Sequence, residues 1–118
     1  MTNPLNISSF IGLTFTEIKG MSKNSQEIMF VTKGKTFSMA GGEGPNNCND
    51  VEVYLEDVCG DVGDLVHSKI ISAVEARSES NQPTYTFYTI RTNKGTVTLR
   101  WYGTSNGYYA EDAYIYQE

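Results

Sequence analysis

The stretch "TVTLRWY" (residues 96–102) carries a clear two-residue alternation of apolar and polar side chains. Because successive side chains of a strand point to opposite faces, Val97, Leu99 and Trp101 share one face. The opposite face carries Thr96, Thr98, Arg100 and Tyr102. We therefore predict that the tryptophan packs in the core, while the arginine and the tyrosine stay accessible.

The sequence around this strand extends the β pattern. Residues 84–92 are also rich in β-forming side chains, and Asn93-Lys94-Gly95 suits a three-residue hairpin loop with the glycine in the left-handed conformation. Residues 103–107 then lead to a last strand over residues 108–116. This arrangement predicts a three-stranded meander at the C-terminus.

The first expected strand covers residues 13–19 and has an imperfect alternation. Phe15 and Ile18 fall on opposite faces of a regular strand, and a β-bulge near Thr16 would bring them together. We therefore expect this strand to be irregular at that position.

Three more strands are expected before the middle of the chain. Residues 27–32 and 35–40 should pair across Lys33-Gly34, because glycine supplies the positive φ that a tight turn needs. The segment "GGEGPNNCN" (residues 41–49) has the composition of a loop. Residues 51–56 then alternate as a strand with one apolar face and one wet face.

Residues 57–68 have partial helical spacing of apolar side chains, although two glycines weaken any helix there. We predict one short helix over residues 61–67, capped by Asp61 or a neighbour, and an extended segment over residues 69–76. The predicted fold class is α+β: mainly antiparallel β-sheet, with about six to eight strands in hairpins and a C-terminal meander, and one short helix.

Length, charge and cysteine content limit the classes of protein that fit. The 118 residues suit a single compact domain, residues 1–118, in which we expect residues 1–9 to be loosely ordered. A net charge of -5 argues against direct nucleic-acid binding. The longest aliphatic or aromatic run, residues 28–31, is too short for a membrane span or a signal peptide, so we expect a cytoplasmic protein without membrane contact. The two cysteines, Cys48 and Cys59, do not resemble a secreted cystine framework, and free thiols are the default.

Two groups of residues are candidates for binding. The first is a tyrosine and arginine surface suited to a protein interface or to stacking on a base, and we assign to it Arg100, Tyr102, Asn106, Tyr108, Tyr109 and Tyr114. The alternative is that a second layer covers these tyrosines and that the arginine only packs on a ring. The second group is an acidic patch in fifteen residues without a compensating cation: Asp50, Glu52, Glu56, Asp57, Asp61 and Asp64.

We find no assembled catalytic set, cofactor motif or metal motif in the sequence. Cys59 and His67 could form a nucleophile and base pair, but no orienting motif accompanies them. Two cysteines and one histidine at these spacings do not make a zinc site, and the acidic run lacks the alternating ligands of a calcium loop. We therefore expect a non-enzymatic protein with no catalytic residues, no metal and no cofactor.

Two segments carry a resemblance to a known family: "VEVYLEDVCGDVGDLVHSKIISAVEARS" (residues 51–78) and "TFYTIRTNKGTVTLRWYGTSNGYYAED" (residues 86–112). Their order and content resemble a family of small, functionally uncharacterised proteins found mainly in bacteriophages. The resemblance covers about residues 13–112. It implies a phage origin and a compact β-rich fold, and it brings no catalytic residues with it.

These features together favour a non-enzymatic phage accessory protein that acts in the host cell cytoplasm. We expect it to bind and inhibit a host macromolecule, a protein or a ribonucleoprotein, as a counter-defence inhibitor of the anti-CRISPR type. One alternative is a small-ligand binder that sequesters a nucleotide immune signal, and another is a virion or assembly component. Exposed sheet edges are compatible with self-association, for example as a homodimer.

Overall fold

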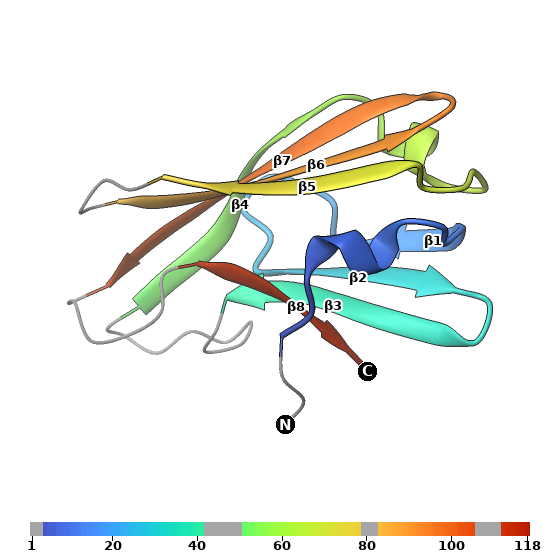
Figure 1. The fold of residues 1–118 in the computed structure, drawn as a ribbon. Helices are drawn as coiled ribbons and strands as arrows, with labels where there is room; N and C mark the ends of the chain where they lie inside the picture. The colour runs from blue at the N-terminus through green and yellow to red at the C-terminus, as the bar shows by residue number, and fades with distance from the viewer. Residues whose placement is uncertain (1–3, 42–50, 79–82, 106–111) are drawn as a thin grey trace.

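Two four-stranded antiparallel sheets pack face to face and enclose the core (Figure 1). The computed structural model describes residues 4–41, 51–78, 83–105 and 112–118. Sheet 1 has the spatial order β1-β2-β3-β8, and its strands are β1 (Phe15–Lys19), β2 (Glu27–Thr32), β3 (Lys35–Gly41) and β8 (Ala113–Gln117). Sheet 2 has the order β4-β7-β6-β5, and its strands are β4 (Val51–Cys59), β5 (Ser72–Arg77), β6 (Thr84–Thr92) and β7 (Gly95–Ser105). The prediction of a mainly antiparallel β fold is confirmed, with eight strands in the described residues.

The last strand lies in a different sheet from the one predicted. β6 and β7 pair as expected, but β8 leaves sheet 2 and pairs with β3 of sheet 1, in a register that places Met39 opposite Ile115. The predicted C-terminal meander is therefore wrong. In sheet 1 the side chains of Ala113 and Ile115 are fully buried, so this pairing gives β8 an apolar face against the core.

The predicted hairpin and bulge in sheet 1 are confirmed. The register of β1 with β2 shifts between Phe15 and Glu17, which leaves Thr16 as the extra residue of a bulge. β2 and β3 join at Lys33-Gly34, and Gly34 has a φ of 102°, in the region that favours glycine.

The turn between β6 and β7 is shorter than predicted. Thr92 pairs directly with Gly95, so the connection has two residues, and Gly95 does not adopt a positive φ. Space explains the glycine instead, because a Cβ at this position would lie 2.5 Å from the Oδ2 atom of Asp64. The hydroxyl of Thr92 fixes the turn by accepting the Lys94 N–H at 3.1 Å.

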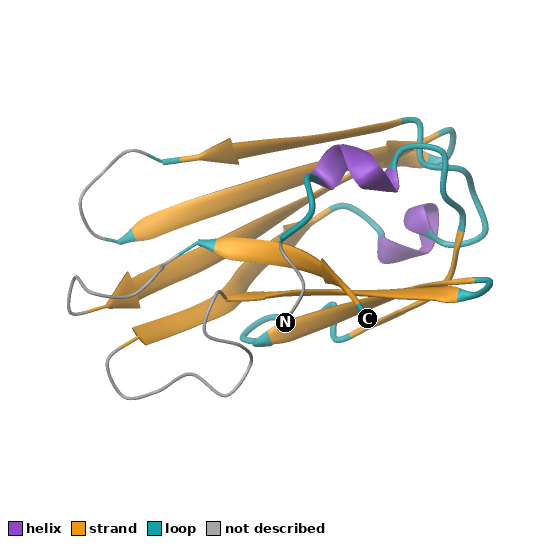
Figure 2. Cartoon of the chain, turned by 60° about the horizontal axis from the view of Figure 1, so that its bottom comes forward, coloured by secondary structure: helices purple, strands orange, loops and turns teal. Residues whose placement is uncertain are grey.

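The predicted short helix is a single 3-10 turn, η2 (Val62–Leu65), and a second one, η1 (Ile7–Phe10), lies near the N-terminus (Figure 2). Asp61 caps η2 as expected, because its Oδ1 atom accepts the Gly63 N–H at 2.9 Å. Four residues with a glycine among them are too few for a stable α-helix. The described residues contain no α-helix, so the α+β class is corrected to an all-β fold. No helix in this part of the chain is long and apolar enough to cross a membrane.

Side chains from both sheets form one apolar cluster between them. Trp101 is fully buried, as predicted, and its indole N–H donates to the Sδ atom of Met39 in sheet 1 at 3.1 Å. Residues 1–3 of the segment expected to be loosely ordered lie outside the described residues. Further along that segment, the Leu5 N–H donates to the Ile115 carbonyl at 2.7 Å and Ile7 is buried in the cluster.

Candidate partner-binding face

The route of the chain through sheet 2 lines up aromatic side chains on its outer face. β7 lies between β4 and β6, and Tyr102 pairs with Tyr54 on one side and with Tyr85 on the other. Paired residues on neighbouring antiparallel strands project to the same face of a sheet. Trp101 points into the core, so this row of tyrosines lies on the side of sheet 2 that faces away from sheet 1.

The aromatic rings of this row contact one another. The ring centroids of Tyr54 and Tyr102 are 5.1 Å apart, and those of Tyr85 and Tyr102 are 5.9 Å apart in an edge-to-face arrangement. Phe87, the next outward residue of β6, stacks on Tyr85 at 6.2 Å. All four rings are half-buried, because each covers its neighbours while part of its surface stays in solvent. We call Tyr54, Tyr85, Phe87, Arg100 and Tyr102 the outer aromatic face.

Arg100 lies on this face between two carboxylates of β4. Its Nε atom is 2.7 Å from the Oε1 atom of Glu56, and its Nη2 atom is 3.9 Å from Asp57 Oδ2. A register shift between Leu55 and Asp57 creates a bulge, which brings both acids to the side of the arginine. The Arg100 side chain is still 42% exposed. The prediction that Trp101 packs inward while Arg100 stays accessible is thus confirmed.

The electrostatic potential at the edge of the outer aromatic face is negative. Burial raises the pKa of the Tyr54 phenol, and the neighbouring Tyr102, Glu52 and Glu56 raise this pKa further. Glu52 is exposed and precedes Tyr54 by two residues on the same face of β4. Three carboxylates against one guanidinium leave two net negative charges beside the tyrosine row.

Tyr114 was predicted to belong to the same surface, but the structure places it elsewhere. It lies on β8 of sheet 1, where the Arg77 guanidinium carbon is 5.2 Å from the centre of its ring. Arg77 also binds two carboxylates, with its Nε atom 2.8 Å from Glu75 Oε2 and its Nη1 atom 2.8 Å from Asp112 Oδ1. Tyr88, from the inner face of β6, donates its hydroxyl to the Ala113 carbonyl at 2.7 Å. We call Glu75, Arg77, Tyr88, Asp112 and Tyr114 the polar junction, because it links the two sheets.

Burial and hydrogen bonding shift the pKa values of three side chains in the polar junction. Burial is the main cause that raises the pKa of both Tyr88 and Tyr114. For Arg77, burial lowers the pKa, but hydrogen bonds to Glu75 and Asp112 outweigh it, so the net shift is upward. The junction therefore holds a charged arginine and two neutral phenols at ordinary pH.

The acidic residues do not form one patch. Glu52 lies opposite Thr104, and Glu56 and Asp57 bind Arg100, which is a compensating cation that sequence order does not reveal. Asp61 caps η2 and Asp64 lies within it, beyond the other end of β4. The five of these acids that lie in the described residues are thus spread along the nine-residue strand β4 and the turn that follows it.

Part of the predicted site cannot be placed, because Asn106, Tyr108, Tyr109 and Asp50 lie outside the described residues, as does Cys48. Cys59 is an exposed free thiol. Tyr54, Tyr85 and Phe87 were missing from the prediction. The alternation in "TYTFYTIRT" (residues 84–92) was the signal for two of them, because Tyr85 and Phe87 alternate with the buried Thr86 and Tyr88.

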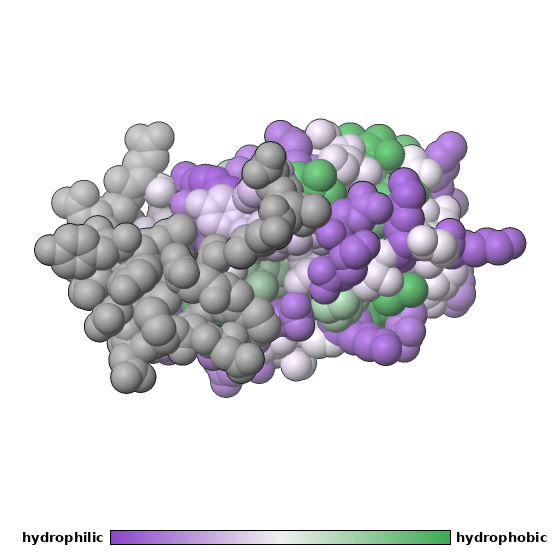
Figure 3. Space-filling view, turned by 90° about the horizontal axis from the view of Figure 1, so that it is seen from below, coloured by the Kyte–Doolittle hydropathy of each residue, from purple (hydrophilic) through white to green (hydrophobic). Residues whose placement is uncertain are grey.

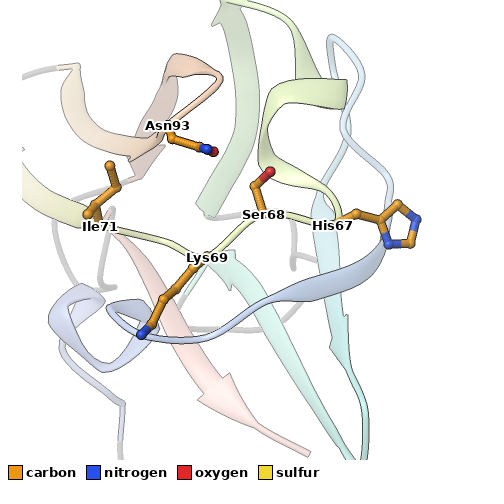
Figure 4. A pocket seen from close by; sticks show the side chains of 5 residues that line it. All are labelled: His67, Ser68, Lys69, Ile71 and Asn93. Atoms are coloured by element: carbon orange, nitrogen blue, oxygen red, sulfur yellow. The ribbon is translucent and has the colours of Figure 1, made fainter.

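Other surfaces of the described residues carry fewer features of a binding site. Figure 3 views the molecule from the side of sheet 1, where hydrophilic and hydrophobic residues are mixed on the described surface. A shallow hollow of about 410 Å³ is lined by His67, Ser68, Lys69, Ile71 and Asn93. In Figure 4 the Ser68 and Asn93 side chains point toward each other, whereas the His67 ring and the Lys69 amine point away from them. The described residues contain no group of three metal-ligating side chains.

Comparison with known proteins identifies the family of the chain. A family model described as a domain of unknown function (DUF7448) matches residues 8–115, which include strands β1 to β7 and the first three residues of β8. No curated protein and no solved structure shows significant similarity to the chain. Because the match covers nearly the whole sequence, the chain belongs to this family, the domain of unknown function DUF7448.

Proposed function

We propose that the chain is a non-enzymatic binding protein and that the outer aromatic face of sheet 2 contacts a partner macromolecule. The observation that carries this proposal is the cross-strand row of Tyr54, Tyr102 and Tyr85, half-buried on a sheet face that points away from the core. Tyrosine and arginine are enriched at the energetic centres of protein interfaces, because they combine large contact area with polar ends.

For the partner we propose a host protein or ribonucleoprotein, with the chain acting as a phage counter-defence inhibitor in the host cytoplasm. The phage origin rests on the sequence resemblance alone. The charge of the face fits a basic partner surface, such as a protein channel that normally holds nucleic acid. Since exposed charges are screened by salt, binding should weaken as ionic strength rises.

The alternative of a nucleotide ligand has less support. It requires Arg100 to bind a phosphate, but Glu56 and Asp57 already bind this guanidinium. Arg100, Glu56 and Asp57 together carry a net negative charge, which repels an anion. A nucleotide would have to displace a charge-assisted contact of 2.7 Å before it gained one of its own.

Photo-crosslinking from the face tests the proposal. Thr98 lies on the same outward row of β7 as Arg100 and Tyr102, so it is a suitable position for p-benzoylphenylalanine. We expect this variant to capture one defined macromolecule in host cells, and excess unlabelled protein should abolish the product. A Tyr102→Ser protein should compete about tenfold less well, within the range of a moderate interface hot spot.

The matched control places the same reagent at Thr36, an outward residue of β3 in sheet 1. This position should give no competable product. Equal products from both positions, or competition by Tyr102→Ser as good as that by the unaltered protein, would contradict the proposal. A captured virion protein would favour an assembly component over a counter-defence inhibitor.

A further inference from the structure

We propose that Tyr54 and Tyr102, together with Glu52, form a subsite for a cationic side chain, arginine or lysine, of the partner. This inference rests on the proposed function, because it names the chemistry that the outer aromatic face recognises. A cation over a tyrosine ring interacts with the negative face of the ring, and a nearby carboxylate adds a charge-assisted hydrogen bond.

The components of this subsite are already close together. The two rings are 5.1 Å apart and inclined by 35°, so they form one continuous aromatic surface. Glu52 lies two residues before Tyr54 on the same face of β4, a separation of roughly 6–7 Å along a strand. A guanidinium is wide enough to rest on a ring while it donates to a carboxylate at this distance.

The polar junction provides an internal example of the same chemistry. There the Arg77 guanidinium lies 5.2 Å from the centre of the Tyr114 ring and binds Glu75 and Asp112 at 2.8 Å each. The outer face repeats this combination of tyrosine ring and carboxylate at Tyr54 and Glu52. Among the described residues no lysine or arginine forms an ion pair with Glu52, so the corresponding cation is left for a partner to supply.

The charge of the surroundings selects a cation over other occupants. Glu52, Glu56 and Asp57 outnumber the single arginine, which excludes an anionic group by repulsion. A purely apolar partner side chain would remove the exposed Glu52 carboxylate from water without replacing its hydrogen bonds, which is costly. A basic side chain satisfies both the rings and the carboxylate.

A titration with an acetylated tetra-arginine amide peptide tests the subsite, with ring-labelled tyrosines followed by NMR. We expect saturable shifts at the Tyr54 and Tyr102 rings, and smaller ones at Tyr114, whose ring already faces Arg77. Glu52→Gln should weaken the peptide about three- to tenfold, and Tyr54→Leu, which keeps apolar bulk but removes the ring, about threefold.

Glu17→Gln is the matched control, because it removes the same charge from an exposed position on β1 of sheet 1. It should leave peptide affinity within about 1.5-fold at moderate salt, because Glu17 belongs to the other sheet and salt screens exposed charges beyond about 10 Å. An equal loss with Glu17→Gln and Glu52→Gln would show attraction to net charge only and would overturn the subsite. Absence of ring shifts, or equal shifts at all tyrosines, would also overturn it.

The subsite and the proposed function can fail separately. If position 98 captures a partner whose binding Glu52→Gln does not weaken, the face is an interface but the cation subsite is wrong. If the peptide binds as expected but position 98 captures nothing, the subsite chemistry stands while the proposed role as a macromolecular binder fails.

Discussion

Arg77 and Arg100 have similar partners but connect different parts of the molecule. Each binds two carboxylates, and each lies beside aromatic rings. Arg77 connects β5 in sheet 2 with Asp112 and Tyr114 at β8, so its contacts cross between the sheets. Among the described residues, both carboxylates that bind Arg100 lie on β4, the strand next to its own, and its side chain is 42% exposed against 30% for Arg77.

The difference separates an arginine that links the two sheets from one that pairs within a single sheet face. Contacts between sheets oppose their separation, and partial burial strengthens them because less water screens the charges. Contacts within one sheet join strands that backbone hydrogen bonds already hold together, and exposed ion pairs add little stability. We therefore expect the outer aromatic face to tolerate substitution better than the polar junction.

Alkaline pH should produce the largest effect, and it acts on the polar junction. The pKa of Tyr88 is raised in the folded protein, so the phenol stays protonated there while unfolded chains lose this proton near pH 10. The stability that Tyr88 contributes is therefore complete below about pH 10 and is lost as pH rises above it, by about 1.4 kcal/mol per pH unit. Urea unfolding at several pH values between 9 and 12 measures this slope.

Tyr88→Phe is the comparison for that slope, since it removes the titrating hydroxyl and keeps the buried ring. The variant should lose about 1 kcal/mol at pH 8, where the hydrogen bond to the Ala113 carbonyl is missing, and its stability should fall less steeply above pH 10. Equal alkaline slopes for the two proteins would show that Tyr88 does not control this transition.

Arg77→Met should have the second largest effect. It leaves Glu75 and Asp112 without their cation in a partly buried site and removes a link between the sheets, so we expect a loss of about 1–2 kcal/mol in the free energy of unfolding. Chemical denaturation at pH 7 measures it. A change below about 0.3 kcal/mol would mean that the junction does not hold the sheets together.

Arg100→Met is the corresponding change on the outer face and should have the smallest effect on stability, below about 0.5 kcal/mol. It leaves the aromatic row in place and makes the face more negative. The tetra-arginine peptide should therefore bind this variant as well as the unaltered protein or slightly better. A stability loss as large as that of Arg77→Met would erase the distinction between the two arginines.

The sequence predicts the faces of single strands better than their partners. The alternation in "TVTLRWY" (residues 96–102) correctly places Trp101 inside and Arg100 outside, because this property depends only on the extended backbone. The sheet to which β8 belongs depends on pairing with β3, more than seventy positions away, and local pattern does not report it. The assignment of Tyr114 to the surface of Arg100 failed for the same reason.

Two local predictions failed for reasons of size and space. The spacing of apolar residues near Asp61 suggested a helix, but the 3-10 turn ends after four residues. The glycine within it disfavours extension into a longer helix. Gly95 was expected to supply a left-handed conformation, whereas it gives room to the Asp64 side chain. The pairing of Arg100 with Glu56 and Asp57 likewise depends on a bulge that the alternation does not reveal.

Hydroxyl-radical footprinting of the tyrosines, on the purified protein and on the same protein in host-cell lysate, tests the central claim most directly. We expect Tyr54, Tyr85 and Tyr102 to be modified in the purified protein and protected in lysate, while the buried Tyr88 stays unmodified in both. Protection confined to Tyr114 and Tyr116 on sheet 1, with the outer aromatic face modified equally in both samples, would contradict the claim.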